Sequence, residues 1–159
     1  MYYRYSGAAP APPKGATFAE ARRRELQALV DTGEVTGLIG YLEGAPVGWV
    51  SLGPREHYAK LKRSPVMKPV DDQAVWSIVC FVVPAPYRGQ GVARALLDGA
   101  IRYAKKRGVK LLEAYPVDKR GRSNDDFMWF GAKRMFDDAG FEEVARRKPT
   151  RPVVRIRPA

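Results

Sequence analysis

The sequence CFVVPAPYRGQGVARALL, residues 80–97, joins an apolar run to a helical pattern through a short turn that contains two glycines. The apolar run ends at two prolines, and Arg88-Gly89-Gln90-Gly91 leads directly into alanines and leucines at helical spacing. This pattern predicts a buried strand, a turn and an amphipathic helix. Glycines let the backbone approach a ligand closely, and the N–H groups of a first helical turn favour phosphate. The turn is therefore predicted to bind a pyrophosphate.

The segments around this turn extend it into a series of strands and helices. Apolar residues recur on one face of the helix from Ala93 to Ala104, and Gly108 ends it. Residues 109–117 predict a strand after the helix, and residues 74–83 predict one before the turn. This order packs the helix across one face of a sheet.

The rest of the chain predicts elements of both kinds. Thr17-Phe18-Ala19-Glu20 is a capping box, which begins a helix with an apolar stripe that runs to Asp31. Glu43-Gly44-Ala45-Pro46 lies between two apolar runs and predicts a hairpin turn. The other predicted elements are hairpin strands 38–42 and 47–52, helices 55–63 and 126–140, and strands 141–147 and 152–157.

Length and composition set limits on the class of protein. A chain of 159 residues that is 45% hydrophobic has the size and core of one domain, so residues 1–159 are expected to form a single domain. No run approaches the roughly 18 apolar residues that span a bilayer, and the first residues lack a secretory signal. One cysteine and one histidine predict no internal disulfide and no protein-built zinc site. We expect a soluble cytoplasmic protein without a metal or a membrane partner.

The net charge of +11 raises the question of an anionic partner. The basic residues recur in several short runs, such as ARRRE, AKLKR and YAKKRGVK, and many of them belong on solvated helix faces. Neither an aromatic RNA-binding signature nor a recognition-helix arrangement stands out. Nucleic-acid binding is therefore the least favoured reading of this charge.

Three kinds of phosphate loop compete for the turn. A Walker loop ends in Gly-Lys-Ser/Thr, but Val92 and Ala93 follow Gly91. A dinucleotide fingerprint has a third glycine where this chain has Arg94. The turn does match RxxGxA, from Arg88 to Ala93. With its flanking strands and the later MFDDAGFEEV segment, it resembles the coenzyme A loop of GNAT-type N-acetyltransferases, over roughly residues 34–157.

This resemblance implies a fold and a cosubstrate. The fold is a mixed α/β (α+β) domain with a central mixed, twisted sheet that splays between two parallel strands, Val75–Val83 and Lys110–Tyr115, and with helices on both faces. The donor is acetyl-coenzyme A (acetyl-CoA), and the acceptor is an amine that enters the gap. A strand that stops pairing leaves backbone groups free to hold pantetheine and polarise a thioester. The implied cofactor-binding residues are Phe81, Val82, Val83, Arg88, Gly89, Gln90, Gly91, Val92 and Ala93, although residues 81–83 also read as an ordinary core strand.

The expected catalytic residues depart from the family pattern. Many members carry a tyrosine that can protonate the leaving thiolate, but the matching position here is Phe136. Tyr115 is the nearest substitute, and Glu113 on the same side of that strand could receive the proton of the amine. The alternative is that Tyr115 packs in the core and Glu113 is a solvated edge charge. Cys80 lies in an apolar strand and is expected to pack there rather than act as a nucleophile.

Two further expectations concern the acceptor side and the start of the chain. His57, Tyr58 and Asp71-Asp72 are expected on loops near the acceptor, as selecting or merely solvated residues. Family members open with a strand and a helix, so Tyr2–Tyr5 is either a shortened edge strand or those elements are missing. Missing elements would expose apolar sheet and favour a homodimer.

Three functions remain open at this point. The first is acetyl transfer from acetyl-CoA to a primary amine of a small molecule or peptide, by direct attack. The second is a catalytically silent domain that senses acetyl-CoA, which Phe136 favours. The third is a basic nucleic-acid-binding module.

Overall fold

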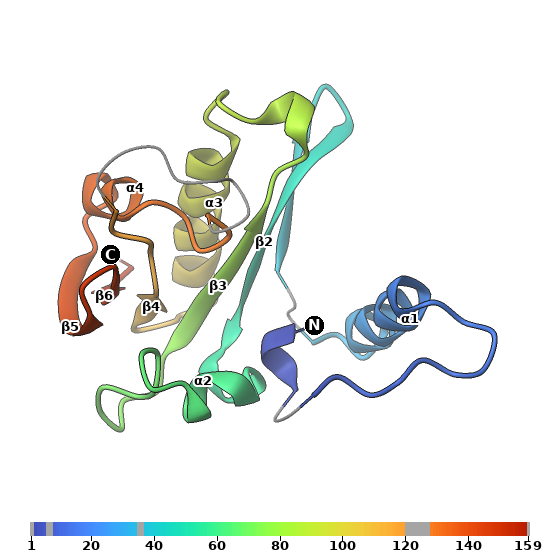
Figure 1. The fold of residues 1–159 in the computed structure, drawn as a ribbon. Coiled ribbons are helices and arrows are strands. Elements are labelled where there is room, and N and C mark those ends of the chain that lie inside the picture. Colours follow the sequence, from blue (N-terminus) through green and yellow to red (C-terminus); the bar gives the residue numbers. More distant parts are fainter. Residues whose placement is uncertain (1, 6–7, 35–36, 120–127, 159) are drawn as a thin grey trace.

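The computed structural model describes residues 2–5, 8–34, 37–119 and 128–158, and its centre is a six-stranded mixed sheet (Figure 1). The strands lie side by side in the order β1-β2-β3-β4-β6-β5. The β3 and β4 strands run parallel, and the other neighbouring pairs of this sheet are antiparallel. The predicted mixed α/β fold is thus confirmed. The bounds are β1 Leu38–Leu42, β2 Ala45–Pro54, β3 Trp76–Val82, β4 Leu112–Ala114, β5 Glu142–Lys148 and β6 Arg151–Ile156.

Helices cover both faces of the sheet, as expected. On one face, α3 and α4 bury apolar side chains against the sheet, among them Leu97 and Phe136. On the opposite face, α2 and the N-terminal turn contribute Leu61 and Tyr3 to a second apolar cluster. The helices are α1 Phe18–Asp31, α2 Ala59–Arg63, α3 Val92–Lys106 and α4 Lys133–Asp138, with 3-10 turns η1 Tyr2–Arg4, η2 Arg55–His57 and η3 Ala85–Tyr87.

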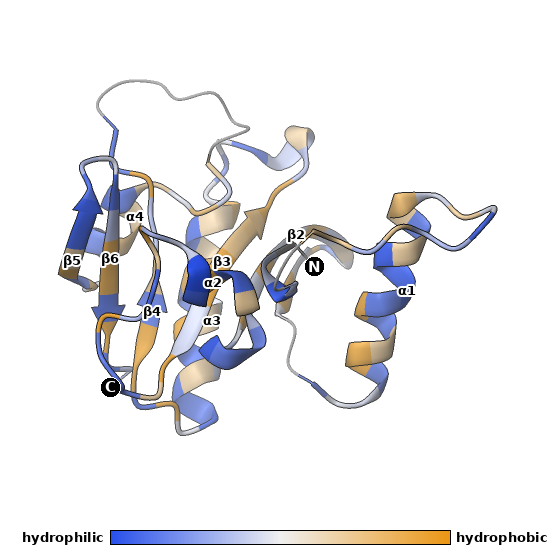
Figure 2. Ribbon diagram, turned by 60° about the horizontal axis from the view of Figure 1, so that its bottom comes forward, coloured by the Kyte–Doolittle hydropathy of each residue, from blue (hydrophilic) through white to orange (hydrophobic). Residues whose placement is uncertain are grey.

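The α1 helix begins where the sequence predicts but packs differently. Its capping box is formed, with the Thr17 and Glu20 side chains each bonded to a backbone N–H of the other residue. The helix stands beside the sheet (Figures 1 and 2), and Ala21 is its only buried residue. Phe18 and Val30, from its apolar stripe, are 60% and 49% exposed. The stripe therefore does not become part of the core of the sheet.

Two predicted helices are shorter in the structure. The pattern over 55–63 is interrupted at Tyr58, which separates η2 from α2. The pattern over 126–140 becomes helical only at Lys133, because residues 128–131 form a turn that Gly131 closes with a φ of 76°. The first two residues of that predicted helix lie outside the described residues. Residues 2–4 form η1, so the expectation of a shortened edge strand there is wrong.

The gap between the two parallel strands holds a chain segment that the sequence did not predict there. The β3 and β4 strands pair only over three residues of each, ending at Ile78 and Ala114. Beyond that point, residues 128–133 bond to both sides: Phe81 N–H donates to the Trp129 carbonyl, and Val117 exchanges hydrogen bonds with Gly131 and Lys133. The sheet splays as predicted, and a segment of the same chain lies in the opening.

Candidate active site

A pocket of about 450 Å³ lies at the end of β3, beside the glycine-containing turn. Five of the nine predicted cofactor residues line it: Phe81, Val82, Val83, Arg88 and Ala93. The other four, Gly89, Gln90, Gly91 and Val92, form the turn and the first residue of α3. The sequence therefore brings the strand end, the turn and the helix start to one place. Cys80, Met128 and Trp129 complete the lining and were not predicted for it.

The turn has the backbone geometry of an anion-binding loop. Gly89 and Gly91 have φ values of 73° and 80°, in the left-handed region that glycine adopts without strain. Space is open around both residues. Gly91 is also the N-cap of α3, and no side chain caps that end. The first N–H groups of a helix have no partner within it, so this end favours a phosphate.

Two side chains of the turn fold back on the preceding segment. Arg88 Nε donates to the Val83 carbonyl at 2.9 Å, and Gln90 Nε2 donates to the Pro86 carbonyl at 2.7 Å. These bonds fasten the turn to the end of β3. The Arg88 guanidinium is exposed at the rim of the pocket, where its charge can attract an anionic cosubstrate.

The expectation that the backbone groups at the end of β3 are free is wrong for Phe81. We expected the backbone groups of residues 81–83 to be free for pantetheine, but Phe81 N–H already donates to the Trp129 carbonyl at 2.6 Å. The Val83 carbonyl likewise accepts from Arg88. The reason is the turn at residues 128–131, which satisfies a strand edge that would otherwise be unpaired. A ligand that used Phe81 N–H would have to replace the Trp129 carbonyl.

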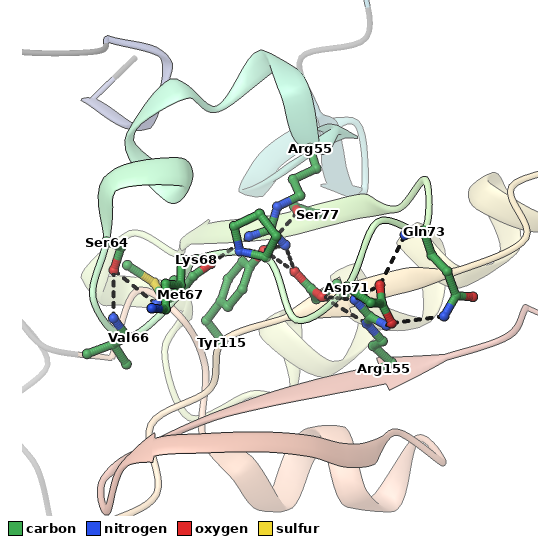
Figure 3. Close-up of polar contacts among 12 residues, drawn as sticks. Arg55, Ser64, Val66, Met67, Lys68, Asp71, Gln73, Ser77, Tyr115 and Arg155 are labelled. Atoms are coloured by element: carbon green, nitrogen blue, oxygen red, sulfur yellow. Dashed lines mark hydrogen bonds and ion pairs between the residues drawn. The ribbon is translucent and has the colours of Figure 1, made fainter.

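Tyr115 and Glu113 lie together inside a buried polar network, as the strand alternation predicts. Figure 3 shows Tyr115 of this network with Arg55 and Ser77. Tyr115 Oη donates to Glu113 Oε1 at 2.6 Å. Its single proton is then used, so Ser77 Oγ at 3.0 Å and Arg55 Nη1 at 3.0 Å act as donors to Tyr115 Oη. Both Tyr115 and Glu113 are completely buried, so Glu113 is not a solvated edge charge.

Two arginines neutralise Glu113 and tie it to the loop that follows α2. Arg55 pairs with Glu113 and donates from Nη2 to the Met67 carbonyl at 2.6 Å. Arg155 donates from Nε to Glu113 at 2.8 Å and holds Asp71 through both terminal nitrogens, at 2.6 and 3.0 Å. This Arg155 contact holds the pKa of the Asp71 carboxyl well below its ordinary value. The network therefore joins β4, β6, η2 and the loop in one unit.

The network and the pocket lie at different levels of the sheet. Tyr115 Oη contacts Ser77, which lies opposite Glu113 where β3 and β4 are still paired. Phe81, in the pocket, is four residues further along β3, or roughly 13 Å at the usual rise of a strand. The assignment of Tyr115 and Glu113 as acid and base stays a prediction, and their contacts give them a structural role.

Burial raises the pKa of Tyr115 to about 12, which predicts a dependence of stability on alkaline pH. A tyrosine whose folded pKa lies above its unfolded value of 10 stabilises the fold below pH 10, and this contribution disappears as the pH passes 12. The difference in unfolding free energy between wild type and Tyr115→Phe should fall by about 2–3 kcal/mol between pH 9 and pH 12.5. Urea titrations across this range measure it, and a constant difference would contradict the assigned burial.

The remaining candidates have mainly packing or anchoring roles. Phe136 is fully buried, with its ring centroid 6.2 Å from that of Phe81 and 5.2 Å from that of Phe141. Tyr58 is also buried, with its hydroxyl 3.1 Å from Ser51 Oγ, so it is not an exposed selecting residue. His57 Nδ1 lies 3.1 Å from Glu34 Oε1.

The other predicted residues are Asp71, Asp72 and Cys80. Asp71 and Asp72 are both exposed, and Asp71 is joined to the buried network through Arg155. Cys80 is partly buried and lines the pocket, and burial raises the pKa of its thiol. A raised pKa keeps the thiol protonated and so does not favour a thiolate nucleophile.

The described residues contain neither a membrane-spanning helix nor a cluster of metal ligands. No helix among them is long and apolar enough to cross a membrane. In the same part of the chain, no group of three or more histidine, cysteine or acidic side chains is placed to hold a metal ion.

Known structures share this fold at low sequence identity. A GNAT-family acetyltransferase from Listeria monocytogenes 4b F2365 aligns with a TM-score of 0.57 and 11% identity, over 90% of this chain and 77% of that one. Ribosomal-protein-alanine N-acetyltransferase from Brucella melitensis aligns with a TM-score of 0.53 and 22% identity, over 89% and 79%. PaiA N-acetyltransferase from Thermoplasma acidophilum, in complex with coenzyme A, gives 0.53 and 13%, over 88% and 71%.

Comparison by sequence gives one match to a family and none to an individual protein. No curated protein matches this chain significantly. The model of the acetyltransferase (GNAT) family matches residues 5–127. The match starts before the region 34–157 over which we expected the resemblance, takes in α1 and the turn Arg88–Gly91, and ends before α4. It covers most of the chain, and we conclude that this protein belongs to the acetyltransferase (GNAT) family.

Proposed function

We propose that this protein transfers an acetyl group from acetyl-CoA to the primary amine of a small molecule by direct attack. The observation that carries this proposal is the pocket at the end of β3, because the turn Arg88–Gly91 and the uncapped start of α3 lie beside it. Membership of the family supports acyl transfer from acetyl-CoA. The choice of an amine acceptor rests on the resemblance of the turn and on the acceptor-side features argued below.

The residues present fit the cosubstrate. N–H groups at the start of α3 and the Arg88 guanidinium would receive the pyrophosphate. Residues 81–83 would hold the pantetheine arm, and Phe81 N–H would donate to the thioester carbonyl once the Trp129 carbonyl has moved. The Phe81 N–H group would then stabilise the negative charge that develops on the carbonyl oxygen during attack.

The reaction needs one bond to form and one to break. The neutral amine nitrogen attacks the thioester carbon, the N–C bond forms and the C–S bond breaks, and one proton passes from the amine to solvent or to the leaving thiolate. Tyr115 and Glu113 remain the proposed acid and base. Water is the alternative, because Tyr115 contacts Ser77, which lies four residues before the pocket residue Phe81 on β3.

A thiol-release assay tests the proposal. Purified protein with acetyl-CoA and a panel of amines, including an alkylamine, a polyamine and a peptide that begins with alanine, should release free thiol with at least one acceptor. Mass spectrometry of the product should show a gain of one acetyl group on that acceptor. Release of thiol without any acetylated product would contradict amine acetylation and indicate hydrolysis.

An acetyl-CoA sensor is the second candidate, and Phe136 is the observation that favours it. Its ring occupies the position where many family members carry an acid, and it is fully buried among other aromatic rings. The two candidates differ in one result. Tight binding of acetyl-CoA without turnover of any amine would favour the sensor.

A further inference from the structure

A second pocket, of about 720 Å³, lies between α1 and the sheet and meets the cosubstrate pocket at Val82. Its apolar lining includes Leu26 and Val30 of α1, Ile39 of β1 and Trp49 of β2. Ile39 lies opposite Trp49, and Trp49 opposite Val82, so these three side chains cross the sheet in one row. The row leads from β1 to the strand end that the thioester would reach.

Four of the eight large apolar side chains that the described residues expose lie along this route. Val30, Ile39 and Val82 are 49%, 55% and 50% exposed, and all three line the second pocket. Trp129, 53% exposed, lines the cosubstrate pocket next to Val82. Exposed apolar residues that gather around a concave site mark binding sites more often than singly scattered ones do. Leu26 and Val30, from the apolar stripe of α1, would then form one wall of the site.

The backbone between α1 and β1 is fitted closely to this site. Gly37 has a φ of 152°, and a Cβ added there would lie 2.1 Å from the Val50 carbonyl oxygen and 2.7 Å from Trp49 Nε1. A side chain at this position would therefore displace either β2 or the indole that lines the pocket. Because Gly37 has no side chain, the backbone that leads into β1 can lie against Trp49.

The charges along the pocket select against anionic acceptors. Among the described lining residues, Glu34 is the only aspartate, glutamate, lysine, arginine or histidine, and it already contacts Arg4 and His57. No lysine or arginine of the described lining is available for a carboxylate or phosphate of the acceptor. A cationic or neutral amine with an apolar body fits this lining, whereas an amino acid or a nucleotide would leave its anion unpaired.

We propose that this second pocket is the acceptor site and that it takes small primary amines with an aromatic or branched apolar body and no anionic group. The inference rests on the proposed acetyl transfer and adds the class of acceptor. The amine nitrogen would lie at Val82, where the two pockets meet, and the apolar body would lie against Trp49, Ile39 and Val30.

A matched set of acceptors tests the class. 2-Phenylethylamine, phenylalanine and spermidine share a primary amine and differ in the added carboxylate or the missing ring. We expect kcat/KM for 2-phenylethylamine to exceed that for each of the others by on the order of 10- to 100-fold, the range that burial of an apolar group supports. Equal or better use of phenylalanine, spermidine or an alanine-starting peptide would overturn the proposal.

Two lysine substitutions in β1 locate the site. Ile39→Lys removes an apolar contact and places a positive charge in the pocket, where it would repel the ammonium form of the amine. Leu42→Lys places the same charge at a similarly exposed position outside the lining, 54% exposed. Binding of 2-phenylethylamine, followed by ligand-observed NMR without acetyl-CoA, should weaken about 10-fold or more in Ile39→Lys and stay unchanged in Leu42→Lys.

The readouts separate this inference from the proposed function. The acetyl-CoA-induced shift in melting temperature should be the same in both variants, because neither residue lines the cosubstrate pocket. Equal amine binding by wild type and Ile39→Lys would refute the acceptor site and leave the acetyl-CoA site standing. A wild type that binds 2-phenylethylamine but not acetyl-CoA would instead refute acetyl transfer.

Discussion

Replacement of Glu113 by glutamine is expected to lower the free energy of unfolding by about 3–5 kcal/mol, the usual cost of removing one partner from a buried ion pair. The Glu113 carboxylate is completely buried between Arg55 and Arg155, whose side chains are only 11% and 8% exposed. Glutamine keeps the volume but removes the carboxylate that pairs with Arg55 and leaves Arg155 paired with Asp71 alone. The loop that follows α2 should loosen as well, because Arg55 and Arg155 also hold it.

Glu142→Gln is the matched control for this change. Glu142 lies on the neighbouring part of the sheet, in β5, but it is exposed. Its replacement should change the unfolding free energy by less than about 0.5 kcal/mol, as surface substitutions usually do. Urea unfolding of the three proteins at pH 7 measures both effects. If Glu113→Gln is as stable as the control, the ion pairs do not hold the two sides of the network together.

Replacement of Gly91 by aspartate is expected to weaken acetyl-CoA binding by on the order of 100-fold or more, because like charges brought together cost several kcal/mol. The new carboxylate would stand at the N-cap of α3, where the pyrophosphate is proposed to bind. The fold should survive the change. Space is open around Gly91, and aspartate is both a good N-cap and one of the residues that tolerates a positive φ.

Gly91→Asn separates charge from size in this experiment. Asparagine has nearly the same shape as aspartate and the same tolerance of the left-handed region, but it carries no charge. Isothermal titration calorimetry should give an affinity for acetyl-CoA much closer to wild type with Gly91→Asn than with Gly91→Asp. Equal affinities for the two variants would place the pyrophosphate elsewhere.

Local sequence patterns predict those parts of the molecule whose structure local contacts decide. The capping box at Thr17, the turn at Gly44 and the glycine-containing turn at Gly91 each set a backbone conformation within a few residues, and all three occur where the sequence places them. The apolar face of α3 is equally local, since Leu96 and Leu97 are buried as their spacing predicts. The cosubstrate pocket follows from these elements.

The errors arise where distant residues decide the structure. The helical pattern before Lys133 gives way to a turn because Phe81 and Val117 offer backbone partners to residues 128–133. The sequence around Glu113 shows a carboxylate in an apolar strand but does not indicate which residue pairs with it. Its partners, Arg55 and Arg155, lie far from it in sequence. A single arginine within the apolar run PVVRI was the available signal, because a buried strand charge requires an opposite one.

The acceptor side was less predictable than the cosubstrate side for a related reason. The stripe of α1 reads as an ordinary core-facing surface, and only its place beside the sheet leaves Val30 exposed at a pocket. Ile39 and Val82 belong to separate strands that the sequence alone does not pair. Their convergence depends on strand order and register.

Thermal unfolding of the wild type with and without acetyl-CoA is the most direct test of the proposal that this protein binds the cosubstrate at the end of β3. A ligand that binds only the native state at 100 times its dissociation constant adds about 2.7 kcal/mol of stability. For a chain of this size, that corresponds to a rise in melting temperature of roughly 5–10 °C. We predict this rise for acetyl-CoA and its loss in Gly91→Asp. An unchanged melting temperature of the wild type at millimolar acetyl-CoA would contradict the proposal.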